Sequence, residues 1–315
     1  MRTDVEKLEA IKAYIRQTSN NEGKPLDQIR REMEIAASNL PKLSNIKREG
    51  IVIGNLRGEW VSADEPIPLE SCDKAILYFH GGGFVSGTCE IYHDLAARIS
   101  LASGVRVLTL DYRLAPEHLY PAANEDCLSA YNWLLANGFS AADIVIGGDS
   151  VGASLTLMTL ISLRDAGVML PAGVFLFSPH TDLVHLDGES YKSRADLDPT
   201  GSLQMNQRIL ADYVGNCSRD QPAILSPLRM DLKGLPGMYI QVGDHEVLLS
   251  DAVRLAELAR TIGIDVTLEV WENMWSVFQF MAGLLPEAQQ AIANIGDYVR
   301  HALKLTKNSA IPLTK

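Results

Sequence analysis

The chain has 315 residues, of which 47% are hydrophobic, which is enough for one large α/β domain with a small appendage or for two domains. Its formal net charge of −11 argues against a nucleic-acid groove or an anionic membrane surface as partner. The N-terminal stretch is charged throughout, and no run approaches the ~18 apolar residues of a membrane helix. We therefore expect a soluble protein of the cytoplasm.

The cysteine pattern indicates no metal site. The four cysteines are far apart and lack the short spacing of metal ligands: Cys72, Cys89, Cys127 and Cys217. Cysteines of this kind stay reduced in the cytoplasm. We expect four free, buried thiols.

Residues 1–45 predict two amphipathic helices that precede every strand. Pro25 suits the first turn of the second helix. Each helix has one apolar face, formed by Val5, Leu8, Ile11 and Ile15 in the first and by Leu26, Ile29, Met33 and Ala36 in the second.

From residue 51 onward, apolar runs alternate with helical patterns. Strands are expected at 51–53, 59–62, 75–79, 105–110, 143–148, 172–177, 237–242 and 265–271. Helices are expected at 91–103, 122–136, 150–166, 203–213, 250–262 and 286–304. This alternation predicts the α/β class, with a mostly parallel sheet covered by helices on both faces. Binding sites in such sheets gather at the carboxyl ends of the strands.

The motif GDSVG, residues 148–152, predicts a catalytic nucleophile at Ser150. It lies between the strand at 143–148 and the helix at 150–166. That is the context of a nucleophile elbow, in which glycines allow a tight turn that holds a serine over the sheet edge. The helix N-terminus offers N–H groups to an oxyanion. A serine N-cap between chance glycines is the alternative.

The stretch HGGGF, residues 80–84, follows the strand at 75–79. Three glycines let the backbone approach a ligand closely, and HGGG is known as half of the oxyanion hole in lipases and esterases. A phosphate loop would need a Lys-Ser/Thr pair after the glycines, and none follows. We expect His80 to be structural. The oxyanion hole is predicted to comprise the N–H groups of Gly81, Gly82, Gly83 and Val151.

Several motifs together resemble the hormone-sensitive-lipase group of α/β-hydrolases, the family IV bacterial esterases. They are HGGGF, DYRLAPEH (111–118), YPAANED (120–126), GDSVGASL (148–155), SPHTDL (178–183) and MWSVF (274–278). The likeness covers essentially the whole chain, with the motifs in family order. It implies an α/β-hydrolase core over 46–315 and cap helices over 1–45, with 186–220 contributing to the cap. Residues 111–118 match a structural segment of the family.

The acid of the triad should follow the strand at 237–242, because the chain order in this fold is Ser, acid, His. Asp244, Glu246 and Asp251 compete for this role. The family pattern resembles an acid, a small or apolar residue, and leucine. Because EVL matches that frame, Glu246 is favoured over Asp244, and Asp251 already opens a helix.

At the histidine position this chain has a serine. The family pattern G-M-x-H-x-F reads NMWSVF here, so Ser276 stands where the histidine is expected. No other histidine is a convincing substitute: His80, His93, His118, His180, His185, His245 and His301. Without a base, Ser150 is a poor nucleophile.

The resemblance thus implies a serine carboxylesterase that needs no cofactor or metal and acts on a small ester. In this chain Ser276 is expected to leave it nearly inactive. We favour a deliberate replacement that traps substrate. A naturally non-catalytic, receptor-type ligand-binding member of the fold and an acyltransferase are the alternatives. The resemblance also implies a possible homodimer through an edge strand such as 265–271.

Overall fold

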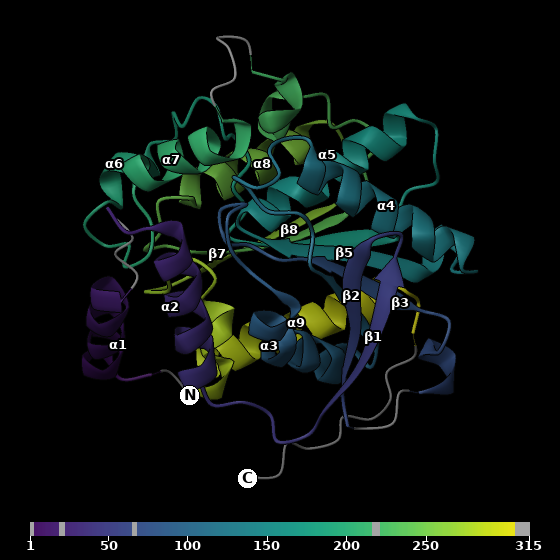
Figure 1. Cartoon of the computed structure of the whole chain (residues 1–315), viewed down its shortest axis with the longest axis horizontal. Helices are drawn as coiled ribbons and strands as arrows, with labels where there is room; N and C mark the ends of the chain where they lie inside the picture. Colours follow the sequence, from purple (N-terminus) through teal and green to yellow (C-terminus); the bar gives the residue numbers. More distant parts are fainter. Residues whose placement is uncertain (1–2, 19–22, 65–67, 216–220, 306–315) are drawn as a thin grey trace.

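The computed structural model describes residues 3–18, 23–64, 68–215 and 221–305. Its centre is one sheet in the order β1-β2-β4-β3-β5-β6-β7-β8 (Figure 1). β2 pairs antiparallel with β1 and β4, and the remaining neighbours are parallel. The strands are β1 Ile46–Ile53, β2 Leu56–Ala63, β3 Ala75–Phe79, β4 Val107–Leu110, β5 Ile144–Asp149, β6 Gly173–Phe177, β7 Met238–Gly243 and β8 Val266–Trp271.

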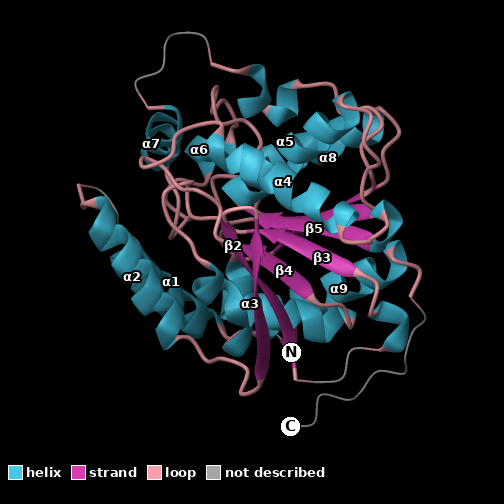
Figure 2. Ribbon diagram, turned by 45° about the vertical axis from the view of Figure 1, so that its right-hand side comes forward, coloured by secondary structure: helices cyan, strands magenta, loops and turns pink. Residues whose placement is uncertain are grey.

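Helices cover both faces of this sheet (Figure 2), with α3 and α9 on one face and α4, α5 and α8 on the other. Alternate residues of β3 enter the two cores, Leu77 and Phe79 one of them and Ile76 and Tyr78 the other, as strand geometry requires. The helices are α1 Val5–Thr18, α2 Leu26–Asn39, α3 Cys89–Ser103, α4 Ala122–Ala136, α5 Val151–Asp165, α6 Ser190–Ser193, α7 Leu203–Val214, α8 Leu249–Thr261 and α9 Pro286–Ala302.

The predicted α/β architecture is confirmed, and two local differences have physical reasons. The first strand begins at Ile46 and not at residue 51, because Ile46 pairs with Ala63 in a longer hairpin. Its added residues 47–50 are exposed, so no apolar pattern indicated them. The helix α6 was not predicted because four residues are too few to show a helical period.

Segments from the two predicted cap regions contact the HGGGF loop. In α2, Arg30 donates from Nε to the Val85 carbonyl at 2.7 Å and pairs with Glu117. In α7, Tyr213 stacks on Phe84 with ring centroids 3.8 Å apart. Figures 1 and 2 both place α2 and α7 on the same side of the molecule. That these segments form a cap over an acyl pocket stays a prediction, and 216–220 lies outside the described residues.

The cysteines are free as far as the structure describes them. Cys89 and Cys127 are buried, but Cys72 is exposed, so the expectation of burial is wrong there. Cys72 follows the short 3-10 helix Leu69–Ser71 at the surface, outside the sheet and its helices. Cys217 lies outside the described residues. Within the described part of the chain, no helix is long and apolar enough to cross a membrane.

The Arg30 contacts predict how strongly α2 is anchored. Arg30→Met removes hydrogen bonds to the Val85 and Ala115 carbonyls and should lower the free energy of unfolding by about 1–3 kcal/mol. Arg31→Met is the matched control, because its pair with Asp27 is 65% and 66% exposed and should contribute under about 1 kcal/mol. Urea unfolding measures both, and equal losses would show that Arg30 is not the anchor.

Candidate active site

Ser150 lies at a sharp turn between β5 and α5. Its backbone has φ 52° and ψ −119°, a conformation that costs a non-glycine residue about 1–3 kcal/mol. Its N–H donates to the Phe177 carbonyl at 3.0 Å, and its carbonyl accepts from His180 N at 3.3 Å. The turn is therefore fixed to the end of the neighbouring strand β6, and Ser150 itself stays partly exposed.

The two glycines of GDSVG are required by close backbone approach. A Cβ on Gly152 would lie 2.0 Å from the Phe79 carbonyl oxygen, and one on Gly148 would lie 2.5 Å from the Gly152 oxygen. Any side chain at either position would push α5 away from β3 and β5. The spacing of the motif thus reflects the packing of helix against strand at the elbow.

A buried carboxylate holds the HGGGF loop against the elbow. Asp149 Oδ1 accepts from the Gly81 N–H at 3.0 Å and from the Tyr78 hydroxyl at 2.8 Å, and Oδ2 accepts from Tyr92 at 2.9 Å. Burial raises the pKa of Asp149 to about 6, and these three hydrogen bonds oppose the rise. Gly81 therefore has acceptors within the protein.

The next two amides of the loop differ from that of Gly81. Gly82 and Gly83 have φ +104° and +64°, values that favour glycine. Among the described residues, no acceptor is recorded for the N–H groups of Gly82, Gly83 or Val151. Val151 begins α5, and Gly82 and Gly83 follow Gly81, which Asp149 holds at the elbow.

Glu246 is completely buried after β7. Its Oε2 accepts from the Ser178 hydroxyl at 3.0 Å and from the Gly243 N–H at 2.9 Å. Its Oε1 is buried and has no hydrogen-bond partner among the described residues. Burial, followed by the charge of Asp198, raises the pKa of Glu246 well above its ordinary value. One oxygen of this carboxyl group is thus available to a further donor.

Asp244 and Asp251, the two other carboxylates weighed from the sequence, have structural partners. Asp244 accepts from Asn273 N at 2.6 Å and its carboxylate is 32% exposed. Asp251 accepts from Thr181 N at 2.7 Å and from Asp182 N at 3.2 Å. Among the described residues, neither carboxylate has a recorded hydrogen bond to Ser178. Their one recorded hydrogen bond near residue 276 is that of Asp244 with Asn273.

Ser276 lies in a loop that Ser178 connects to the acid. The Val277 N–H donates to Ser178 Oγ at 2.9 Å, and the same hydroxyl donates to Glu246. Trp275 and Phe278 are buried on either side, whereas Ser276 is partly exposed. Hence the backbone of Ser150, the carboxyl group of Glu246 and the loop that contains Ser276 all bind the end of β6 or the residue that follows it.

Most histidines are occupied elsewhere or lie at the surface. His80 is buried, donates from Nδ1 to the Gly81 carbonyl at 2.7 Å and stacks on Tyr112, as expected of a loop-holding residue. His93 pairs with Glu59, His185 with Asp182, and His245 contacts Lys12 Nζ at 2.9 Å. His118 and His301 are exposed.

His180 is closer to Ser150 than its sequence indicated, because its backbone binds the Ser150 carbonyl. Its ring is fully buried, and neither ring nitrogen has a hydrogen-bond partner among the described residues, the Ser150 hydroxyl included. Burial lowers the pKa of His180 to about 4. An imidazole of that pKa is a weak base, and no recorded contact links it to Glu246.

Comparisons with known proteins identify the family of this chain. A family model for the alpha/beta hydrolase fold matches residues 76–280. An acetyl-hydrolase of Streptomyces hygroscopicus is 36% identical over 255 residues, which are 80% of this chain and 82% of the relative. An esterase of Acinetobacter venetianus is 33% identical over 258 residues, 82% of this chain and 83% of the relative.

Among solved structures, an esterase from the bacterial hormone-sensitive lipase family is 38% identical, with a TM-score of 0.89, and the match covers 96% of this chain and 99% of that one. The chain belongs to the bacterial hormone-sensitive-lipase family of the alpha/beta hydrolase fold. The family predicted from the motifs is confirmed, and by family the chain is a carboxylesterase or acetyl-hydrolase.

Two polar residues of this hormone-sensitive-lipase-like site were not predicted. Ser178 joins Glu246 to the 276 loop, and Asp149 joins the elbow to the HGGGF loop. Both directly follow or end a fully buried strand, β6 or β5. A polar residue at the carboxyl end of a buried parallel strand was the feature that could have indicated them.

The raised pKa of Asp149 predicts a specific dependence of stability on pH. The folded pKa of about 6 exceeds the ordinary 3.8, so the folded state binds this proton more tightly, and stability falls as pH rises between those values. Asp149→Asn should remove this change, which amounts to about 3 kcal/mol across the window. Asn can still accept the Gly81 N–H.

Urea unfolding between pH 4 and 7 measures the effect as the difference between variant and parent. Asp73→Asn is the control, because Asp73 is 74% exposed. Parallel stability curves for the parent and the Asp149 variant would contradict the assignment of this proton to Asp149.

Proposed function

We propose that this site performs the acyl-transfer chemistry of a serine esterase, with Ser150 as nucleophile, Glu246 as acid, and Ser276 at the position of the base. The observation that carries the proposal is the hydrogen-bonded connection from Glu246 through Ser178 to Val277, next to the strained turn of Ser150. The chain as it stands then binds esters and hydrolyses them very slowly.

In the proposed reaction, Ser150 Oγ attacks the ester carbonyl and gives a tetrahedral oxyanion. The free N–H groups of Gly82, Gly83 and Val151 support its stabilisation, and Gly81 contributes by fixing the loop through Asp149. The proton of Ser150 must leave as the bond forms, and the departing alcohol must gain one. Side chains and backbone N–H groups suffice for these steps, so we propose no cofactor or metal.

The missing step is proton transfer. A hydroxyl at position 276 is no base near neutral pH, and loss of a triad histidine costs on the order of a millionfold in kcat. Ester binding does not require the imidazole, because the loop amides and the segments above them are held by other residues. A substrate complex that persists without turnover is therefore the expected state, as for a substrate-trapping variant.

We propose that the substrate is a small ester and that the protein acts in the cytoplasm. We propose neither nucleic acid nor a membrane as a partner. A homodimer through β8 is also proposed: β8 is the last strand of the sheet, and its Val270 is 49% exposed. EstE5, a solved structure of 37% identity and TM-score 0.88, was soaked with p-nitrophenyl butyrate, which makes p-nitrophenyl esters a reasonable first probe.

Ser276→His should restore hydrolysis. We expect kcat on short p-nitrophenyl esters to rise by several orders of magnitude with a modest change in KM, because the imidazole acts mainly in the transition state. The restored activity should be lost in Ser150→Ala/Ser276→His, and an organophosphate should label Ser150 in the Ser276→His protein.

Two results would contradict this proposal. One is hydrolysis by the unaltered chain at ordinary esterase rates, around 10 s⁻¹ or more. The other is a Ser276→His protein that binds esters without hydrolysing them, which would favour a receptor-type ligand-binding role. Ester products formed from an added alcohol in place of acid would indicate an acyltransferase.

The choice of acid is tested in the same background. Glu246→Gln should lower kcat of the Ser276→His protein by roughly ten-thousandfold, as when a triad acid is neutralised. Asp244→Asn is the matched control, and its cost should be far smaller because Asp244 accepts from Asn273 in a turn. Steady-state kinetics measure both, and the reverse ranking would assign the acid to Asp244.

A further inference from the structure

The turn that contains Glu246 is bound by a segment that precedes β7 in the chain, residues 190–198. Residues 244–248 connect β7 to α8, and four backbone groups of residues 244–250 bind side chains of the segment 190–198. Arg194 Nε donates to the Asp244 carbonyl at 2.8 Å, and Ser190 Oγ donates to the Val247 carbonyl at 2.5 Å. The same Ser190 oxygen accepts from Ser250 N at 2.9 Å.

The fourth contact comes from Asp198. Its Oδ2 accepts from the Val247 N–H at 2.8 Å, and its Oδ1 accepts from Thr200 N, Thr200 Oγ1 and Gly201 N at 2.8, 2.8 and 2.9 Å. Asp198 is 7% exposed. Both oxygens of this buried carboxylate are thus engaged: Oδ1 binds its own loop, and Oδ2 binds the residue that follows Glu246.

Packing reinforces these contacts. Val247 and Leu248 form a small buried cluster with Tyr191, separate from the two main cores. A Cβ on Gly201 would lie 3.0 Å from Val247 Cγ2 and 2.9 Å from Asp198 Oδ2, so only glycine fits there without displacement. The segment 186–203 is therefore seated closely on the acid turn.

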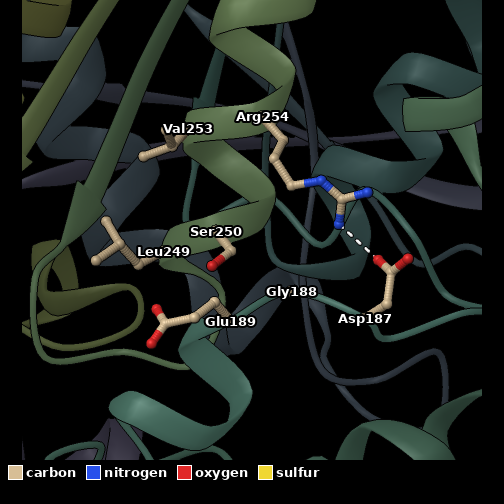
Figure 3. A pocket seen from close by; sticks show the side chains of 7 residues that line it. All are labelled: Asp187, Gly188, Glu189, Leu249, Ser250, Val253 and Arg254. Atoms are coloured by element: carbon tan, nitrogen blue, oxygen red, sulfur yellow. Dashed lines mark hydrogen bonds and ion pairs between the residues drawn. The ribbon is translucent and has the colours of Figure 1, made fainter.

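Figure 3 shows the neighbouring part of this contact. Asp187 and Glu189 face the first turns of α8, and Asp187 pairs with Arg254 at 2.7 Å across a cavity of about 420 Å³. A Cβ on Gly188 would lie 2.9 Å from Ser250 Cβ. The segment thus contacts the acid turn at Asp244 and Val247 and continues along α8.

We propose that Asp198 is a positioning residue for Glu246: by binding the Val247 N–H it fixes the acid turn from the predicted cap segment. This inference rests on the proposed catalytic role of Glu246. The core holds the Glu246 carboxylate through Ser178 and Gly243, and Asp198 holds the following peptide. The packing of the segment 186–203 against this turn would then also orient the Glu246 side chain.

The arrangement has an electrostatic cost that a merely structural contact would avoid. Asp198 adds negative charge beside a buried carboxyl group, and after burial it is the largest cause of the raised pKa of Glu246, with Asp251 a smaller one. In the proposed triad, an imidazole at position 276 would bind Glu246 and so lie near the same charge, which favours its protonated form. Removing the charge should therefore move both titrations to lower pH.

The test compares Asp198→Asn with Asp196→Asn, a control that makes the same charge change in the same loop at an exposed residue. Asn cannot accept from Val247 and from Thr200 and Gly201 together. In the Ser276→His background, Asp198→Asn should lower kcat by about ten- to a hundredfold, the scale expected for a misplaced catalytic group, with little change in KM. The acid limb of kcat/KM should move to lower pH.

Thr200→Val provides a second variant that keeps the charge and removes one hydrogen bond from Oδ1. It should lower kcat less than Asp198→Asn and leave the acid limb in place. It also tests the proposal should Asp198→Asn fail to fold. Unchanged kcat in both Asp198→Asn and Thr200→Val, or an acid limb that moves equally in the Asp196 control, would overturn the proposal.

Backbone hydrogen exchange of the chain with Ser276 unchanged gives a readout independent of hydrolysis. The peptide spanning 244–250 should exchange faster in Asp198→Asn and at the parent rate in Asp196→Asn. Equal exchange of this peptide in the two variants would overturn the proposal that Asp198 fixes Val247. An inactive Ser276→His parent would count against the proposed function, and the exchange comparison would then decide whether Asp198 holds the turn.

Discussion

The geometry of the site depends on two hydrogen bonds of the Ser178 hydroxyl group. It donates to Glu246 Oε2 and accepts from the Val277 N–H, while the preceding residue, Phe177, accepts from the backbone of Ser150. The end of β6 and the turn after it therefore hold the backbone of Ser150, the carboxyl group of Glu246 and the loop of residue 276. Because none of these contacts uses the side chain at 276, a serine there leaves the arrangement intact.

Several local features of this arrangement lower the stability of the folded protein. Ser150 has an unfavourable backbone conformation, and Asp149 and Glu246 are carboxyl groups enclosed by the protein. Buried carboxyl groups without full partners lower stability. The sheet offsets these costs, because β3, β5 and β6 are buried at every position and pack helices on both faces. A rigid core thus carries a strained edge, as is usual for catalytic sites.

The sequence predicted the parts of the molecule that depend on local pattern. The bounds of β3 and α4 agree with prediction, because continuous apolar runs and helical periods end there at glycines or turns. The choice between Glu246 and Asp244 needed a family frame. The structure separates them physically: one carboxyl group is buried beside Ser178, and the other closes a turn at Asn273.

The hold of Asp198 on Val247 could not be predicted in the same way. The two residues are 49 positions apart, and the polar segment around Asp198 has no periodic pattern. Likewise, Asp149 binds Gly81 from 68 positions away, so its role appears only when β3 and β5 lie side by side. A position at the end of a buried strand can indicate that a residue such as Asp149 is a candidate, but its partner is set by tertiary packing, which no local feature of a single sequence encodes.

The burial and incomplete hydrogen bonding of Glu246 bear on the role of this site, in which residue 276 is a serine. Glu246 is buried near the charge of Asp198, and its Oε1 has no hydrogen-bond partner among the described residues. Such a carboxyl group is destabilising, and a neutral residue of similar size would relieve the cost. A chain that had long served only to bind a ligand would gain stability from that exchange, and from relaxing the turn at Ser150 as well. Both features persist, although each is useful only together with a base. Their persistence therefore supports the proposed hydrolytic role of this site over a role in ligand binding alone.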